Sequence, residues 1–184
     1  MSQKEIIIVR HGKPDSAVNN RINAAEFAQW VRQYNKSPLD PTSHAITTTD
    51  LSDYRVLTST LKRARLLAEK YTGQSGFEAY SLFNEMDIPR YKIKGRLRAW
   101  NWVYLNRGLW LAGRKGPFES FSEAKVRALQ ASYFLDNMAT SSPKIALFAH
   151  AMTNRFLIKY LQAAGWELTQ KDFNFWGLCR LRKG

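Results

Sequence analysis

The 184-residue sequence contains a single cysteine, Cys179, and only three histidines. One cysteine excludes an internal disulfide, and so few cysteine and histidine ligands exclude a zinc framework. Long hydrophobic runs are scarce as well, because the apolar stretch near the N-terminus covers residues 6–9 and ends at Arg10. That stretch is too short for the core of a signal peptide or for a membrane span. We therefore expect a soluble cytoplasmic protein with one domain over residues 1–184.

Acidic residues are the other scarce class. The chain has 15 aspartates and glutamates against 28 lysines and arginines, which gives a formal net charge of +13. A charge of this size attracts anions and speeds their capture. Nucleic acid, an anionic membrane surface and a phosphorylated small molecule all fit it, and the charge alone does not choose among them. The hydrophobic fraction of 45% is that of an ordinary globular protein.

Segments typical of strands alternate with segments typical of helices. Strands are expected over residues 5–10, 55–58, 78–83, 144–149 and 175–182. Helices are expected to begin at the capping boxes Asn23/Glu26 and Ser120/Glu123, after Leu61, and after His150. In the helix after Ser120, the side chains expected to face the core are Val126, Leu129 and Tyr133. The alternation predicts an α/β fold, a three-layer α/β/α sandwich with a mostly parallel central sheet.

Polar residues gather where these strands end. In open α/β sheets, ligands bind beyond the carboxyl ends of the strands. The residues placed there are two arginines, two histidines and a carboxylate: Arg10, His11, Arg63, Glu85 and His150. The pattern therefore predicts an anion-binding site that contains a nucleophile.

Several short motifs near these residues resemble one known family. The motifs are Val-Arg-His-Gly at 9–12, Thr-Ser-Thr-Leu-Lys-Arg-Ala at 58–64, Leu-Phe-Asn-Glu at 82–85, Glu-Ser at 119–120 and Leu-Phe-Ala-His at 147–150. In this order they resemble the motifs of the histidine phosphatase superfamily, whose members include phosphoglycerate mutases and phosphohistidine phosphatases. The resemblance is spread over residues 5–165 and implies a phosphoglycerate mutase-like fold.

The resemblance also implies roles for the site residues. His11 would be the nucleophile that forms a phosphohistidine, since a neutral imidazole needs no deprotonation near pH 7. It is expected to lie exposed at the end of the first strand. Arg10 and Arg63 would depress the pKa of His11 and bind phosphoryl oxygens in a bidentate manner. His150, protonated when phosphate is bound, would also bind the phosphoryl oxygens. Glu85 would protonate the leaving oxygen.

The acid has a second candidate, and some residues and groups are expected to have no part in the site. Asp87 lies two residues beyond Glu85 and is the second candidate for the acid. No metal and no cofactor are expected, because the arginines would supply the positive charge. His44 matches no motif and is expected at the surface, and Cys179 is expected in the core.

The sequence departs from the family pattern at three places. Ala151 follows the second histidine where glycine is common, and it would cost about 1 kcal/mol if that position needed φ > 0. Thr60 replaces a common proline, and Lys13 follows Gly12 where phosphoglycerate mutases tend to have other residues. The departure after Gly12 favours a phosphomonoester phosphatase. The alternatives are a phosphoglycerate mutase-like phosphotransferase and a non-catalytic basic module that binds membrane or nucleic acid.

A basic and aromatic insertion is expected at about residues 90–117. Its residues 90–115 include eight basic side chains, three tryptophans and no acid. One interpretation is a structural lid whose aromatic side chains complete the core. The other is a substrate lid or docking surface, in which Arg96, Arg98 and Trp102 would contact the substrate. The expected partner is a small phosphorylated substrate, a metabolite or a lipid, with peripheral contact to an anionic surface as an option; nucleic acid is not expected.

Overall fold

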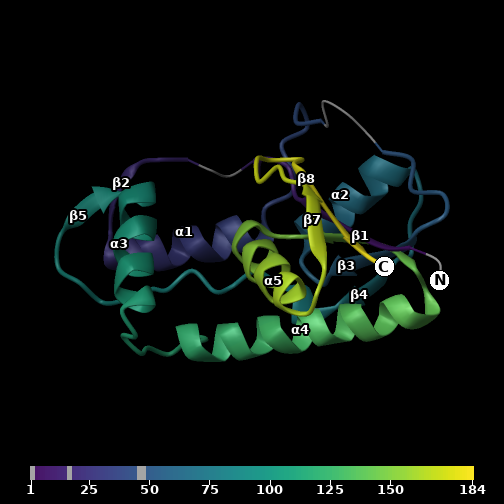
Figure 1. Ribbon diagram of the computed structural model, residues 1–184. Coiled ribbons are helices and arrows are strands. Elements are labelled where there is room, and N and C mark those ends of the chain that lie inside the picture. The colour runs from purple at the N-terminus through teal and green to yellow at the C-terminus, as the bar shows by residue number, and fades with distance from the viewer. Residues whose placement is uncertain (1–2, 16–17, 45–48) are drawn as a thin grey trace.

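The computed structural model describes residues 3–15, 18–44 and 49–184 (Figure 1). Its strands are β1 (Lys4–Arg10), β2 (Arg21–Asn23), β3 (Arg55–Ser59), β4 (Glu78–Tyr80), β5 (Arg96–Arg98), β6 (Lys144–Ala149), β7 (Glu167–Gln170) and β8 (Leu178–Lys183). Its helices are α1 (Ala24–Lys36), α2 (Lys62–Thr72), α3 (Ala99–Leu111), α4 (Phe121–Ser141) and α5 (Ala151–Ala163), with a 3₁₀ turn at Ser81–Phe83. Within these described ranges, no helix is long and apolar enough to cross a membrane.

Six strands form the central sheet in the order β4-β3-β6-β1-β8-β7. Strands β4, β3, β6 and β1 run parallel, whereas β8 is antiparallel to both of its neighbours. Strand β1 lies inside the sheet because its residues 6–9 are apolar on both sides of the strand. The mostly parallel sheet predicted from the sequence is confirmed.

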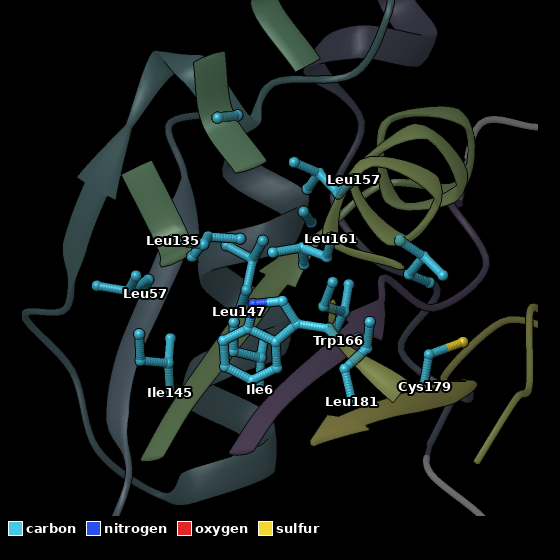
Figure 2. Close-up of a cluster of buried hydrophobic side chains, with 14 of the residues drawn as sticks. Ile6, Leu57, Leu135, Ile145, Leu147, Leu157, Leu161, Trp166, Cys179 and Leu181 are labelled. Atoms are coloured by element: carbon cyan, nitrogen blue, oxygen red, sulfur yellow. The ribbon is translucent and has the colours of Figure 1, made fainter. Parts of the chain in front are cut away.

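Alternate residues of β1 point to opposite faces of the sheet. Ile6 and Ile8 pack with residues of α4 and α5, and Figure 2 shows part of this cluster around Leu135, Leu157 and Trp166. Ile7 and Val9 pack on the other face against α2. Helices thus cover both faces, which confirms the three-layer sandwich. Cys179 lies in the first cluster and is 1% exposed, as expected.

The expected helix boundaries follow from local hydrogen bonds. The Asn23 side chain accepts from the backbone N–H of Glu26 at 2.9 Å, and the Glu26 carboxylate accepts from the Asn23 N–H at 2.7 Å. Ser120 and Glu123 form the second reciprocal box. Both capping boxes predicted from the sequence are therefore present.

Helix α4 differs from the prediction in the face that it buries. Val126 and Tyr133 are 55% and 56% exposed, so the expectation that they face the core is wrong. The buried stripe consists mainly of small residues: Ala124, Ala128, Ala131, Ser132, Leu135 and Ala139. Small side chains allow α4 to lie close to its neighbours. Because these side chains are only weakly hydrophobic, a pattern based on large apolar residues does not identify the buried face.

The third and the last of the predicted strands are shorter in the structure than predicted. The expected strand at 78–83 ends at Tyr80 and continues as a 3₁₀ turn, and the last strand begins at Leu178 rather than Phe175. Strand β7 lies in a mostly exposed, polar segment that gave no strand pattern.

Four elements form a distal unit beyond one end of the sheet (Figure 1). Strands β2 and β5 pair antiparallel, and α1 packs against α3 through Phe27, Trp30 and Trp102. The basic and aromatic segment at 90–117 therefore contributes a strand and a helix to this unit. Six of the eight cations of residues 90–115 are exposed, and two of the three tryptophans, Trp102 and Trp110, are buried, as a structural lid requires.

Candidate active site

His11 follows directly after β1 and its hydrogen bonds define its tautomer. Its Nδ1 lies 2.7 Å from the Gly12 carbonyl oxygen, which can only accept a hydrogen bond. The Arg63 Nε–H, which can only donate, points to His11 Nε2 at 3.3 Å. Nδ1 therefore carries the proton, and the lone pair of Nε2 is directed toward Arg63.

The environment of His11 keeps the ring neutral. Burial, the Arg63 guanidinium and, more weakly, Arg10 lower the pKa of His11 to about 3, against the opposing hydrogen bond to Gly12. The neutral nucleophile expected from the sequence is consistent with this pKa. The expectation that His11 lies exposed at a strand end is wrong, because the side chain is only 2% exposed.

The loop between β7 and β8 accounts for this burial. The Phe175 ring centroid lies 6.0 Å from the His11 ring. A Cβ atom added to Gly12 would lie 2.5 Å from Trp176 Nε1, so glycine is required there by the close approach of the indole. Trp176 is the one described residue other than glycine with a positive φ, at 63°. The loop packs tightly over the end of β1.

His150 lies at the end of β6, with its ring centroid 5.1 Å from that of His11. Its Nε2 is 2.6 Å from Ser59 Oγ, and the Leu61 N–H donates to the same oxygen at 3.2 Å. Burial and then the Arg63 charge hold the pKa of His150 well below its usual range. His150 is thus neutral near pH 7 here, and the protonated form expected from the sequence would need the added charge of a phosphate dianion.

The two arginines reach the histidines from different elements. Arg63 is 1% exposed, and its NH1 group donates to the Asn35 carbonyl at 3.3 Å. Arg10 donates to the Phe173 carbonyl at 2.7 Å and stacks 4.1 Å from the centroid of the Phe175 ring. Burial lowers the pKa of both guanidiniums, yet both remain charged near pH 7.

Two buried nitrogen atoms of the site lack hydrogen-bond partners among the described residues. They are Arg10 Nε and His150 Nδ1. Buried polar atoms are nearly always paired in native proteins, and exceptions need an explanation such as a bound ion or water. Together with the buried Arg63 and the half-buried Arg10, these atoms make the site suited to an anion.

Glu85 is held at the N-terminus of α5. Its carboxylate accepts from the backbone N–H of Met152 at 3.3 Å and of Thr153 at 3.1 Å, and from the Thr153 hydroxyl at 3.2 Å. The charge of Glu85 acts on Arg10, Arg63 and Arg107, whereas the charge of Asp87 acts on Arg107. Glu85 is thus coupled to both arginines of the site.

Tyr34, a buried residue of α1, lies beside the site although no sequence motif points to it. Its ring lies 5.4 Å from the Arg63 guanidinium carbon, and it interacts electrostatically with Arg10 and Glu85. Burial raises the pKa of Tyr34, so the phenol keeps its proton. Its position in the helical stripe of α1 gave no sign of this role, because the stripe carries buried aromatics throughout.

The structure does not bring Arg96, Arg98 and Trp102 to this site. Trp102 is 1% exposed and donates its indole N–H to the Ile22 carbonyl at 2.8 Å, so its predicted contact with substrate is wrong for this structure. Arg96 and Arg98 lie on β5 beside Asn23 and Arg21. That is the opposite end of α1 from Tyr34, about 16 Å away at 1.5 Å per residue.

The remaining expectations concern Ala151, His44 and metal binding. Ala151 begins α5 and its φ is not positive, so the expected strain at this position is absent. His44 is exposed, as predicted. No group of three or more histidine, cysteine or acidic side chains in the described part of the chain could hold a metal ion.

Comparison with solved structures shows what this architecture is similar to. A phosphoglycerate mutase from Bacillus anthracis matches with a TM-score of 0.62 at 12% identity, covering 99% of this chain and 88% of that one. An open reading frame product of Mycobacterium tuberculosis matches with a TM-score of 0.59 at 16% identity, covering 98% and 94%. A phosphoserine phosphatase from Entamoeba histolytica gives 0.54 at 16% identity, covering 96% and 89%. No family profile and no curated protein sequence matches the chain.

The low pKa of His11 predicts that acid destabilises the protein. The unfolded chain takes up a proton near the ordinary pKa of 6.5, whereas the folded chain resists it down to about 3. Stability should therefore fall as the pH drops through this window, by up to about 1.4 kcal/mol per pH unit for each such histidine. Urea unfolding between about pH 7 and pH 4 measures the slope. His11→Gln should reduce the slope of stability against pH, and His44→Gln should leave it unchanged. An equal slope in both variants contradicts the prediction.

Proposed function

We propose that this chain, which has the fold of phosphoglycerate mutase-like proteins, is a phosphomonoester phosphatase that works through a phosphohistidine at His11. The observation that carries the proposal is the unprotonated Nε2 of His11, buried between Arg63 and His150. An unprotonated nitrogen beside cations is suited to attack on a phosphoryl group, once the phosphoryl oxygens take over the Arg63 N–H that the nitrogen accepts here, and the cations stabilise the negative charge of that group.

The reaction would proceed in two balanced steps. In the first, Glu85 takes up a proton from solvent as the anionic substrate binds beside it, His11 Nε2 forms a bond to phosphorus while the bond from phosphorus to the ester oxygen breaks, and Glu85 gives its proton to the departing alcohol. In the second, water attacks the phosphorus, Glu85 takes a proton from that water, and the P–N bond breaks. Inorganic phosphate leaves, and both residues return to their starting states.

The positive groups have distinct positions around this reaction. Arg63 lies beside Nε2 and is held by the Asn35 carbonyl, and it would bind an oxygen of the transferring group. Arg10 would have to exchange its stacking on Phe175 for phosphate oxygens. His150, next to His11, would bind a third oxygen and become protonated as the anion arrives.

A substrate screen tests the proposal directly. The purified protein is incubated with a panel of phosphorylated metabolites, lipids and phosphopeptides, and released phosphate is measured. A ³²P label that is stable in base and lost in acid should appear on the protein during turnover. Failure to release phosphate from any member of the panel would overturn the proposal.

Replacing Glu85 with glutamine separates the acid from a purely structural residue. Glutamine can still accept hydrogen bonds from α5, but it cannot donate a proton to the leaving group as a carboxylic acid does. We expect turnover of alkyl phosphates to fall by about a hundredfold and that of p-nitrophenyl phosphate by less than about tenfold. Asp87→Asn is the matched control. Equal slowing of both esters by Glu85→Gln, or selective slowing by Asp87→Asn, would move the acid role elsewhere.

A further inference from the structure

A groove of about 680 Å³ lies outside the site, between α1 and the segment at residues 90–94. The residues that line it are Ala24, Ala25, Ala28, Gln29, Arg32, Arg90, Tyr91, Lys92, Ile93 and Lys94. In Figure 1 this segment runs beside α1 on its way to β5. None of the residues was singled out as a substrate contact in the sequence.

The base of the groove is apolar. Three alanines of α1 line it: Ala24 packs at the edge of the cluster around Phe27 and Trp30, Ala28 is half-buried and Ala25 is exposed. Across from them, Tyr91 belongs to a second hydrophobic cluster against which Ile93 packs, and the Asn106 side chain accepts a hydrogen bond from the Tyr91 backbone N–H at 2.7 Å. Alanine at these positions leaves the space that a larger side chain would fill. The groove can therefore take an alkyl chain.

The rim of the groove carries positive charge alone. Its cations are Arg32, Arg90, Lys92 and Lys94, and no acidic residue lines it. None of the four forms an ion pair with a carboxylate in the described ranges. Glu26, the one acid of α1, is engaged by Arg96 at 3.8 Å and by the Asn23 N–H. A groove with an apolar base and a cationic rim is complementary to an anionic amphiphile.

Both walls of the groove lead toward the candidate active site. On α1, Arg32 is followed one turn later by Asn35, about 4.5 Å further along the helix axis. The Asn35 carbonyl is the partner of Arg63. The opposite wall continues from Arg90 back to Glu85, which caps α5. A molecule whose phosphoryl group lies at His11 could thus extend its leaving group into the groove.

We infer that the substrate is an amphiphilic phosphomonoester, whose alkyl leaving group lies on the alanines and whose second acidic group is bound by Lys92 and Lys94. The inference rests on the proposed function for the location of the phosphoryl group. The groove itself is independent of it, because its shape and charge arise from α1 and residues 90–94. In this inference the residues of the groove contact the leaving group, in place of the predicted contacts from Arg96, Arg98 and Trp102.

Kinetics with three phosphate esters test the inference. The esters are ethyl phosphate, dodecyl phosphate and a dodecyl phosphate with a terminal carboxylate. The wild type should show a KM that falls in this order. Ala28→Trp fills the groove and should reduce the KM advantage of dodecyl over ethyl phosphate by at least about tenfold, since several buried methylene groups are lost. Ala163→Trp, at an exposed alanine of α5, should retain the advantage.

Charge variants address the rim separately. Lys92→Ala combined with Lys94→Ala should remove the benefit of the terminal carboxylate and leave that of the alkyl chain. Lys159→Ala, at an exposed lysine of α5, is the control. Equal KM values for ethyl and dodecyl phosphate in the wild type, or no response to Ala28→Trp, would overturn the inference.

A binding measurement distinguishes failure of the groove from failure of the proposed function. Calorimetry with dodecyl phosphonate, which cannot be hydrolysed at the carbon–phosphorus bond, reports binding without turnover. Binding that weakens in Ala28→Trp supports the groove even if no ester is hydrolysed. Binding that is unchanged in Ala28→Trp overturns it. The inference is also overturned if the protein binds phosphatidylglycerol vesicles but not the soluble phosphonate, because the occupant of the groove would then be a membrane.

Discussion

Replacing His11 with alanine should lower kcat by at least about a thousandfold, because the substitution removes the atom that would bond to phosphorus. The ³²P label found on the wild-type protein should be missing. His11 is buried, so the variant should also lose stability, by about 1–3 kcal/mol. His11→Gln is the better-packed second variant and should be equally inactive.

The exposed residue His44 supplies the control for this experiment. Its side chain is exposed and its Nδ1 lies 2.9 Å from the nearby Thr42 carbonyl oxygen, so His44→Ala should keep full turnover. Circular dichroism and thermal unfolding establish that each variant is folded at the assay temperature. Substantial turnover by a folded His11→Gln protein would rule out the phosphohistidine.

Substituting Arg63 with lysine should lower kcat by about a hundredfold although the charge is conserved. The guanidinium spans two contacts, one to His11 Nε2 and one to the Asn35 carbonyl, and a single ammonium cannot reproduce this planar arrangement. Loss of one preorganised donor to a developing anion costs about a hundredfold to a thousandfold in other enzymes. Steady-state kinetics with p-nitrophenyl phosphate measures the loss.

Arg65 provides a matched comparison on the same helix. It is two residues further along α2 and exposed, so Arg65→Lys should change kcat by less than about twofold. If Arg63→Lys and Arg65→Lys have the same small effect, the guanidinium geometry does not matter. Arg63 would then act only as a distant positive charge.

The predictable parts of this fold are those encoded in short stretches of sequence. Strand β1 follows from four consecutive apolar residues, and α1 and α4 begin where their capping boxes lie because these hydrogen bonds join residues three apart. The inward face of α4 did not follow, since it depends on which side of the helix meets α5. There, close packing selects Ala128 and Ala131 over the larger Val126.

The candidate site shows the same division. Four of its five residues lie at strand ends or on the first turn of a helix, and Glu85 follows the 3₁₀ turn after β4, so topology was enough to expect them together. Their burial was not predictable, because Phe175 reaches His11 from a loop far along the chain. Likewise, the role of Glu85 as an acceptor for the N-terminus of α5 depends on a contact across 68 residues.

The segment at residues 90–98 illustrates a misleading pattern. Its alternation of basic and apolar residues suggests one surface with a common role. In the structure the alternation covers two environments: Lys92 and Lys94 line the groove, whereas Arg96 lies on β5 beside Asn23. Trp102 then follows in α3 and faces inward. Only the path of the backbone through the distal unit separates these roles.

The order in which the strands are added to the sheet has a consequence for synthesis of the protein. Strand β1 is made first, yet its neighbours are β6 and β8, and Glu5 on β1 pairs with Arg182 across 177 residues. Arg10 is likewise bound to a carbonyl 163 residues away. Contacts at such separations form slowly, because most of the chain must be ordered before they do. On the ribosome, the end of β1 that carries His11 therefore cannot form its final contacts until β8 has emerged. The site is among the last parts of the molecule to assemble.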